Sequence, residues 1–171
     1  YLPVTIDLTS LGAIPGDTLQ LAVMADNSDD KNYPPGKPQI TLDFAYHGGM
    51  YRDVWMICKN KVAITDAIEA NKTAGGGMFV HYNNISAKSA DVFIDTEIKN
   101  NSPRAKSLSI ETSLTDKSGK IVRKISSKLT LKAGESKTIN QKTTVANPHL
   151  WSPETPDLYQ VAIQVKEGKT S

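Results

Sequence analysis

The stretch Leu108-Ser-Ile-Glu-Thr-Ser-Leu-Thr-Asp-Lys-Ser-Gly-Lys-Ile-Val-Arg-Lys-Ile-Ser-Ser-Lys-Leu-Thr-Leu131 decides the fold class of this chain. Leucine and isoleucine alternate with polar residues on both sides of the tetrapeptide Asp116-Lys-Ser-Gly119. A period of two is typical of strands with one buried and one solvated face, and Asp and Gly between two such runs indicate a turn. The stretch therefore predicts two strands joined by a hairpin turn.

The same alternation extends in both directions from this hairpin. A second turn signal, Ala133-Gly-Glu135, follows it, and turn signals recur about every ten residues. Six or seven short strands at this spacing predict an immunoglobulin-like sandwich. Cys58 is the only cysteine, so this sandwich would lack the disulfide of antibody domains. The expected strands lie at 78–82, 92–99, 108–114, 120–131, 139–145 and 159–166.

The first part of the chain is less regular. Apolar alternation predicts strands near 4–8, 19–25, 50–58 and 62–65, and the polar, proline-rich stretch 27–38 predicts a loop. Three successive glycines, 75–77, carry a high conformational-entropy cost in any regular element. We therefore place a Gly-rich linker at 71–77, between a first domain, 1–70, and a second domain, 78–171.

Composition excludes several classes of protein. The chain has 171 residues and a net charge of +2 with its lysines dispersed among acidic residues, which argues against a nucleic-acid partner. Its apolar runs are too short to span a bilayer, so we expect no membrane partner. The N-terminus lacks the features of a signal peptide and is typical of the middle of a strand. We therefore expect the parent protein to begin earlier.

Two segments carry a family resemblance. The first is Asp43-Phe-Ala-Tyr-His-Gly-Gly-Met-Tyr-Arg-Asp-Val-Trp55, and the second is Asn147-Pro-His-Leu-Trp-Ser-Pro-Glu-Thr-Pro-Asp-Leu-Tyr159. In this order they resemble signatures of glycoside hydrolase family 2, the beta-galactosidase and beta-glucuronidase group. The resemblance covers nearly all of the chain. It implies an all-β fold, in which the C-terminal part of a sugar-binding jelly roll precedes an immunoglobulin-like β-sandwich.

The resemblance also implies where catalysis occurs. Hydrolysis of a glycosidic bond usually needs two carboxyl groups on either side of the scissile bond, and in the family both are glutamates of a barrel whose sequence is absent here. We expect no catalytic residue in this chain, which would serve as an accessory region of a beta-galactosidase-like exo-glycosidase. Its partners would be the barrel of the parent chain and the carbohydrate substrate. Half a jelly roll leaves sheet edges exposed, and such edges could mediate oligomers.

Asp43 is the strongest candidate for direct substrate contact. The resemblance implies that an aspartate here reaches the barrel's active site, where an ionised carboxylate accepts hydrogen bonds from sugar hydroxyls. An ordinary turn aspartate is the alternative. His47 is a weaker candidate for substrate binding.

The other motif residues are expected to be structural. Gly48 and Gly49 would allow a positive φ or a close backbone approach. Arg52 and Asp53 would form a pair that locks the loop as it enters a strand. Trp151 would anchor the sandwich to its neighbours.

No cofactor is expected, and no metal site is complete within this segment. Two other readings stay open. One is a free-standing carbohydrate-binding module that uses Tyr46, Tyr51 and Trp55, and the other is a purely structural sandwich pair. The substrate could be a galactoside, a glucuronide or a mannoside. The compartment is open, with a periplasmic or secreted location favoured over the cytoplasm.

Overall fold

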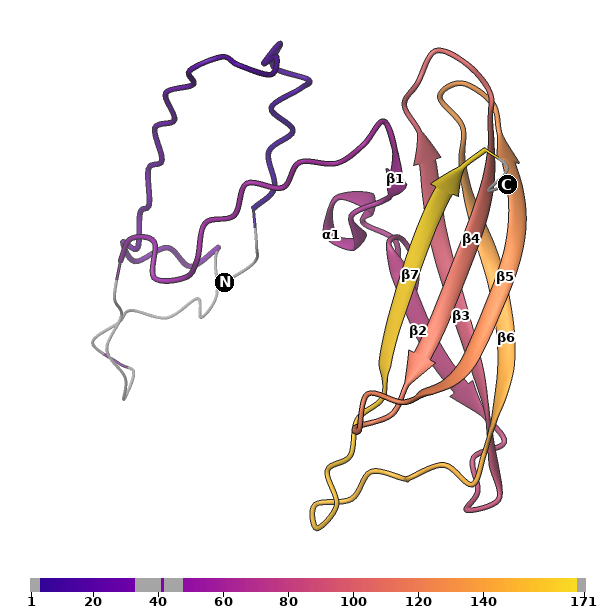
Figure 1. Ribbon diagram of the computed structural model, residues 1–171. Coiled ribbons are helices and arrows are strands. Elements are labelled where there is room, and N and C mark those ends of the chain that lie inside the picture. The colour runs from indigo at the N-terminus through magenta and orange to yellow at the C-terminus, as the bar shows by residue number, and fades with distance from the viewer. Residues whose placement is uncertain (1–3, 33–40, 42–47, 169–171) are drawn as a thin grey trace. The chain divides into compact units, whose positions relative to one another are not determined.

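The computed structural model describes residues 4–32, 41 and 48–168 (Figure 1). The chain forms two compact units by its internal contacts. The larger unit contains all the helices and strands of the described residues, from Val62 to Glu167. The smaller unit comprises the described part of residues 6–58.

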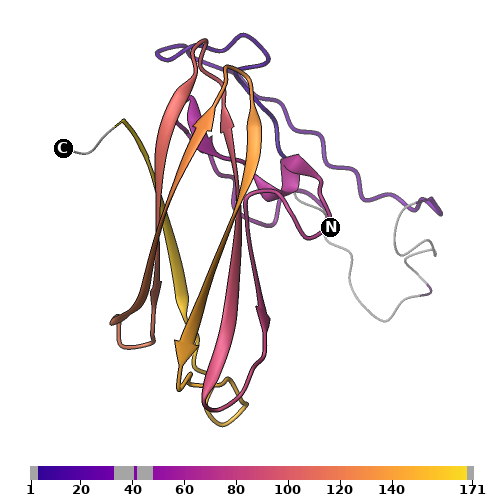
Figure 2. The same ribbon diagram turned by 90° about the vertical axis from the view of Figure 1, so that its right-hand side faces the viewer.

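The larger unit is a sandwich of two antiparallel sheets. In one sheet, β3 pairs with β6 along one edge and with both β1 and β2 along the other. The second sheet has the order β5-β4-β7. Figure 2 shows the long strands of the two sheets facing one another. The elements are β1 (Val62–Ile64), α1 (Ala67–Ala70), β2 (Met78–Asn83), β3 (Ser89–Asn100), β4 (Lys106–Thr115), β5 (Ile121–Leu131), β6 (Ser136–Ala146) and β7 (Gln160–Glu167).

The core lies between the sheets, where the alternating apolar side chains point inward. Ile94 and Ile98 from β3 and Ile110 from β4 are fully buried, as is Leu131 at the end of β5. Burying a side chain of this size stabilises a fold by about 1.5–3 kcal/mol. The predicted all-β sandwich is therefore confirmed. The period-two pattern identified the inward faces of β3 and β4, whereas at the start of β5 Ile121 is 47% exposed and Val122 packs against the core.

The hairpin at the centre of the sequence argument forms as expected. β4 pairs with β5 in an antiparallel register that runs from Lys106 opposite Leu131 to Thr115 opposite Ile121. The Asp116 carboxylate accepts hydrogen bonds from the backbone N–H groups of Ser118 and Lys120. Gly119 has a φ of +81°, a conformation that glycine adopts without steric cost.

The segment between β1 and β2 is packed against the sheet. β1 pairs with the end of β3, so the strand expected near 62–65 belongs to the sandwich sheet. Asp66 caps the N-terminus of α1 by accepting hydrogen bonds from two backbone N–H groups. Gly76 and Gly77 are buried and have positive φ values. These glycines therefore allow close packing, and the domain limits 1–70, 71–77 and 78–171 stay a prediction.

No strand forms in the described part of residues 4–58, so the strands expected at 4–8, 19–25 and 50–58 are wrong there. Their alternating apolar side chains are exposed, with Val23 at 62% and Trp55 at 77%. A strand requires a neighbour to pair its backbone N–H and C=O groups, and alternation alone does not supply one. The assignment of this region to a jelly roll stays a prediction.

Candidate functional site

Two of the predicted site residues, Asp43 and His47, lie outside the described residues. Their assignment to substrate binding therefore stays a prediction. The motif that contains them continues into the described residues at Gly48. The motif residues Gly48, Gly49, Arg52 and Asp53 therefore all lie in the described part of the chain.

The glycine pair has two distinct geometric demands. A Cβ added to Gly48 would lie 2.9 Å from side-chain atoms of Asn27, so any larger residue would force that side chain to move. Gly49 has a φ of +91°, in the region that favours glycine. At this point in the loop, Gly48 therefore allows the close approach of a side chain, and Gly49 allows a positive φ.

Arg52 and Asp53 are both exposed, and the Arg52 guanidinium carbon lies 5.5 Å from the centroid of the Tyr51 ring. An exposed cation–π contact of this kind contributes about 0.5–1 kcal/mol. The role of the pair in fixing the loop stays a prediction.

Trp151 lies in the long loop between β6 and β7, in the other unit, and its indole is 59% exposed. Ser152 and Thr155 exchange backbone hydrogen bonds of 3.1 Å beside it, and their hydroxyls lie 3.0 Å apart. Lys117, from the β4–β5 turn, forms an ion pair of 2.8 Å with Asp157. Trp151 is therefore an exposed ring on an internally hydrogen-bonded loop, a geometry that suits contact with a neighbouring surface.

The three glutamates on the strands of the sandwich, Glu97, Glu111 and Glu167, have lysine partners. Glu111 lies 2.8 Å from Lys166, and Glu167 forms an ion pair with Lys106. Glu97 differs from the other two, because its side chain is only 6% exposed. The segment that leads from β1 to β2 covers it.

Glu97 joins that segment to the sheet. Its Oε1 lies 2.6 Å from the Lys72 ammonium and accepts a hydrogen bond of 2.8 Å from the Ser136 hydroxyl. These two contacts, with Lys72 the larger, lower the pKa of Glu97. A carboxyl group held ionised in this way is poorly suited to act as a general acid and well suited to fix the β1–β2 connection.

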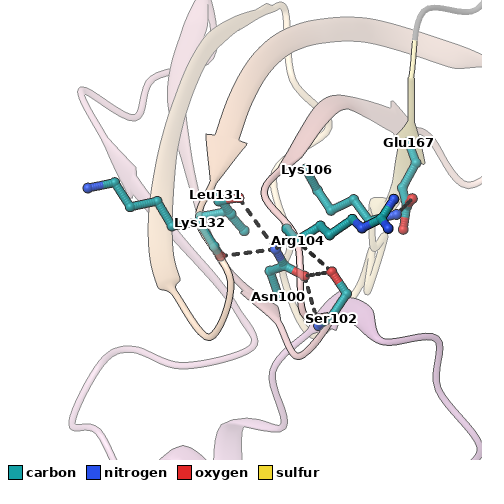
Figure 3. Close-up of polar contacts among 7 residues, drawn as sticks. All are labelled: Asn100, Ser102, Arg104, Lys106, Leu131, Lys132 and Glu167. Atoms are coloured by element: carbon teal, nitrogen blue, oxygen red, sulfur yellow. Dashed lines mark hydrogen bonds and ion pairs between the residues drawn. The ribbon is translucent and has the colours of Figure 1, made fainter.

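A buried amide also escaped the sequence analysis. Asn100, at the end of β3, donates from Nδ2 to the carbonyl oxygens of Arg104, Leu131 and Lys132, and its Oδ1 accepts from the backbone N–H and the hydroxyl of Ser102 (Figure 3). Asn100 is fully buried. One amide thus ties together the end of β3, the end of β5 and the turn before β4. No sequence pattern marked it, because an Asn between strands looks like a turn residue.

The remaining surface of the sandwich offers little that resembles a catalytic centre. A cavity of about 440 Å³ lies beside β1 and β7 and is lined by Val62, Ser102, Lys106, Val165 and Glu167 among others. Within the described ranges, no group of three or more His, Cys, Asp or Glu residues could hold a metal ion. Over the same ranges, no helix is long and apolar enough to cross a membrane.

Gly48, Gly49, Arg52 and Asp53 belong to the smaller compact unit and Trp151 to the larger one. Comparison with curated proteins identifies relatives along nearly the whole chain. A beta-glucuronidase of Formosa agariphila is 31% identical over 98% of this chain, which is 17% of the relative. Beta-galactosidase BoGH2A of Bacteroides ovatus is 27% identical over 87% of this chain and 15% of its own length. The chain therefore spans less than one fifth of these relatives.

Solved structures show the same similarity. A beta-glucuronidase 2 from Bacteroides uniformis superposes with a TM-score of 0.72 at 28% identity, covering 85% of this chain and 16% of that structure. A beta-glucuronidase from glycoside hydrolase family 2 gives a TM-score of 0.58 at 30% identity over 63% of this chain and 11% of its own. Residues 77–171 match the family model described as Glycosyl hydrolases family 2. The chain belongs to glycosyl hydrolase family 2.

Proposed function

We propose that this chain is the non-catalytic accessory region of a longer family 2 glycosidase that hydrolyses β-glycosides. The observation that carries the proposal is the extent of the match: 98% of this chain aligns with only 17% of a beta-glucuronidase. Most of such a protein, including room for a catalytic barrel, lies outside the aligned region. The sandwich would support that barrel as its partner within the parent chain.

The internal chemistry of the sandwich supports this role. Glu97, Glu111 and Glu167 are engaged by lysines, and Glu97 is held in its ionised form by Lys72 and Ser136. These glutamates, each paired with a lysine, do not form the pair of opposed carboxyl groups that glycoside hydrolysis usually requires. The sandwich instead has the features of a scaffold: a continuous core and buried hydrogen bonds that fix its loops.

Asp43 would be the contribution of this chain to substrate binding. In this proposal the loop that carries it projects into the barrel's pocket and its carboxylate orients the terminal sugar by accepting hydrogen bonds from hydroxyl groups. Galactosides and glucuronides are the substrate classes that the names of the relatives suggest.

The test is Asp43→Ala in the complete parent enzyme. Loss of a charge-assisted hydrogen bond to substrate costs about 1.5–3 kcal/mol, so kcat/KM should fall by roughly 10- to 150-fold. Asp26→Ala is the matched control, because Asp26 is an exposed loop aspartate whose carboxylate accepts from the backbone N–H of Ser28. Wild-type kcat/KM in the Asp43 variant would remove the assignment of Asp43.

Assays of the 171-residue chain alone test the accessory role. We expect no turnover of chromogenic β-galactosides or β-glucuronides, because the reacting carboxyl groups would be on the barrel. Turnover by the purified chain would contradict the proposal. Calorimetry against the same sugars separates it from a free-standing carbohydrate-binding module, which would bind measurably. Sedimentation velocity tests whether free sheet edges lead the chain to oligomerise.

A further inference from the structure

The connection from β1 to β2 is attached to the sandwich at one residue of β3. Along one edge, β3 pairs with β2 up to Thr96 and with β1 from Ile98 onward, so Glu97 lies where the partner strand changes. The Glu97 carbonyl accepts a hydrogen bond of 3.0 Å from the Thr65 N–H, and the Glu97 N–H donates to the Gly77 carbonyl at 2.9 Å. Both ends of the connection therefore meet at Glu97.

The middle of the connection is attached to the side chain of the same residue. Lys72, which follows α1, lies 2.6 Å from Glu97 Oε1, and the Ser136 hydroxyl on β6 donates to that oxygen at 2.8 Å. Glu97 Oε2 is buried and accepts no hydrogen bond from the described residues. The carboxylate therefore depends on Lys72 for compensation of its charge, and removing the partner of a buried charge is costly. We call the Glu97–Lys72 pair the latch.

The latch lies next to the strand through which the chain enters the sandwich. The smaller unit ends at Cys58, and Lys59 belongs to the larger unit. β1 follows with three residues, and among the described residues it pairs with β3 alone. Val62 at its start packs into the core, whereas Ile64 at its end leads directly into the connection. So short an edge strand opens easily unless the chain on both sides of it is held.

We propose that the latch is a positioning device for the smaller unit: it holds β1 in place and thereby fixes the point from which the loop of Asp43 extends toward the substrate. Since Asp43 is the substrate contact of the proposed function, this role of the latch rests on that function. Glu97 and Lys72 themselves touch no substrate. Hydrogen bonds from Lys72 and Ser136 lower the pKa of Glu97, so the pair is charged at neutral pH.

Kinetics of the complete parent enzyme give the first test. Lys72→Met keeps the length of the side chain and removes the ammonium group. A displaced Asp43 would bind the ground state and the transition state equally less well, so KM should rise by roughly 3- to 10-fold while kcat changes by less than about 2-fold. Lys72→Arg keeps a cation that can pair with the carboxylate and should return KM to within about 2-fold of the wild-type value.

A matched control and a double variant make this test specific. Lys166→Met removes a lysine from an ion pair of 2.8 Å with Glu111, outside the connection, and should leave KM unchanged. In an Asp43→Ala background, Lys72→Met should change kcat/KM by less than about 2-fold, because the contact that it displaces is already missing. Equal effects of Lys72→Met in the two backgrounds would overturn the proposal.

Spin labels on the 171-residue chain give a second test, which involves no substrate. Cys58, the only cysteine, is replaced by serine, and labels are attached through Thr18→Cys in the smaller unit and Ser126→Cys on β5, both exposed positions. Double electron–electron resonance should give a broader distribution of distances with Lys72→Met than without it, and an unchanged one with Lys166→Met. An unchanged distribution with Lys72→Met would overturn the proposal.

The two tests distinguish a failure of the latch from a failure of the proposed function. If Asp43→Ala lowers kcat/KM but Lys72→Met acts independently of it, the proposed function stands and the positioning role of the latch is wrong. If Asp43→Ala leaves kcat/KM at the wild-type value, the substrate contact of the proposed function is wrong. The spin-label distances then decide by themselves whether the latch positions the smaller unit.

Discussion

The Thr112 hydroxyl on β4 donates a hydrogen bond of 2.6 Å to the side-chain oxygen of Gln141 on β6, across the interior of the sandwich. Both residues are at least 97% buried, and the Gln141 amide in turn reaches Ser127 on β5. This polar bridge joins the two sheets at a point where the alternating pattern alone would place an apolar contact. A buried hydrogen bond that is fully made adds specificity, and one that loses a partner is costly.

Gln141→Leu should therefore destabilise the chain by about 1–3 kcal/mol, because the buried Thr112 hydroxyl and the half-buried Ser127 hydroxyl lose their partner. Thr112→Val should cost less than Gln141→Leu, and the double variant should be more stable than the sum of the two single changes predicts. Thr130→Val, an exposed Thr on β5, is the control. Urea unfolding measures all four variants, and strict additivity would contradict the coupling.

Asn100 is predicted to be the least replaceable polar residue of the sandwich. Asn100→Asp replaces an amide that donates to three carbonyl oxygens with a carboxylate oxygen that repels them. We expect a loss of about 3–5 kcal/mol, comparable to leaving a buried charge without a partner. The neighbouring change, Asn101→Asp, introduces the same charge at an exposed position and should be nearly neutral. Similar unfolding midpoints for the two variants would show that the hydrogen bonds of Asn100 contribute little.

Asp91 should give the stability of the sandwich a specific pH dependence. Hydrogen bonds from Thr144, Asn84 and Lys142, in that order, lower its pKa from 3.8 to about 2. Because the folded state binds this proton more weakly than the unfolded state, the contribution of Asp91 is complete above about pH 4 and is lost as the pH falls toward about 2. Thermal unfolding followed between these values should show a shallower decline for Asp91→Asn than for the wild type.

The control for that experiment is Asp95→Asn, which removes one negative charge from the same face of β3. Asp95 accepts a single side-chain hydrogen bond, from Asn140 at 2.6 Å, within the described residues. A wild-type slope between pH 4 and pH 2 in the Asp91 variant would contradict the assignment. A general effect of net charge would change both variants equally.

The sandwich could be predicted from sequence because its signals are local. Alternation over 108–131 identifies both strands and most of their inward faces, and the Asp116–Gly119 turn joins them; a register shift between Leu114 and Thr115 leaves Val122 rather than Ile121 on the core. Glu97 and Asn100 could not be assigned in this way, because their burial depends on segments that are distant in sequence or not strand-like. The alternation at 19–25 has the pattern of a strand, but no strand forms there, because the described residues provide no neighbouring strand to pair with it.

The three glycines 75–77 provide the last prediction. A flexible linker would tolerate alanine at each position. In the structure, a Cβ on Gly76 would lie 2.6 Å from the Ala70 Cβ at a φ of +74°, whereas on Gly75 its nearest neighbour would be the Lys72 Cβ at 3.5 Å. Gly76→Ala should therefore destabilise the chain by about 1–3 kcal/mol through overpacking and backbone strain.

Gly75→Ala is the matched control within the same tripeptide and should change stability by less than about 0.5 kcal/mol in either direction. Chemical denaturation of the two variants distinguishes a packed connection from a flexible one. If both alanines are tolerated equally, residues 71–77 behave as the linker that their composition suggests. If only Gly76→Ala is harmful, the connection from β1 through α1 to β2 is an integral part of the sandwich, held to the sheet by Lys72 and Glu97.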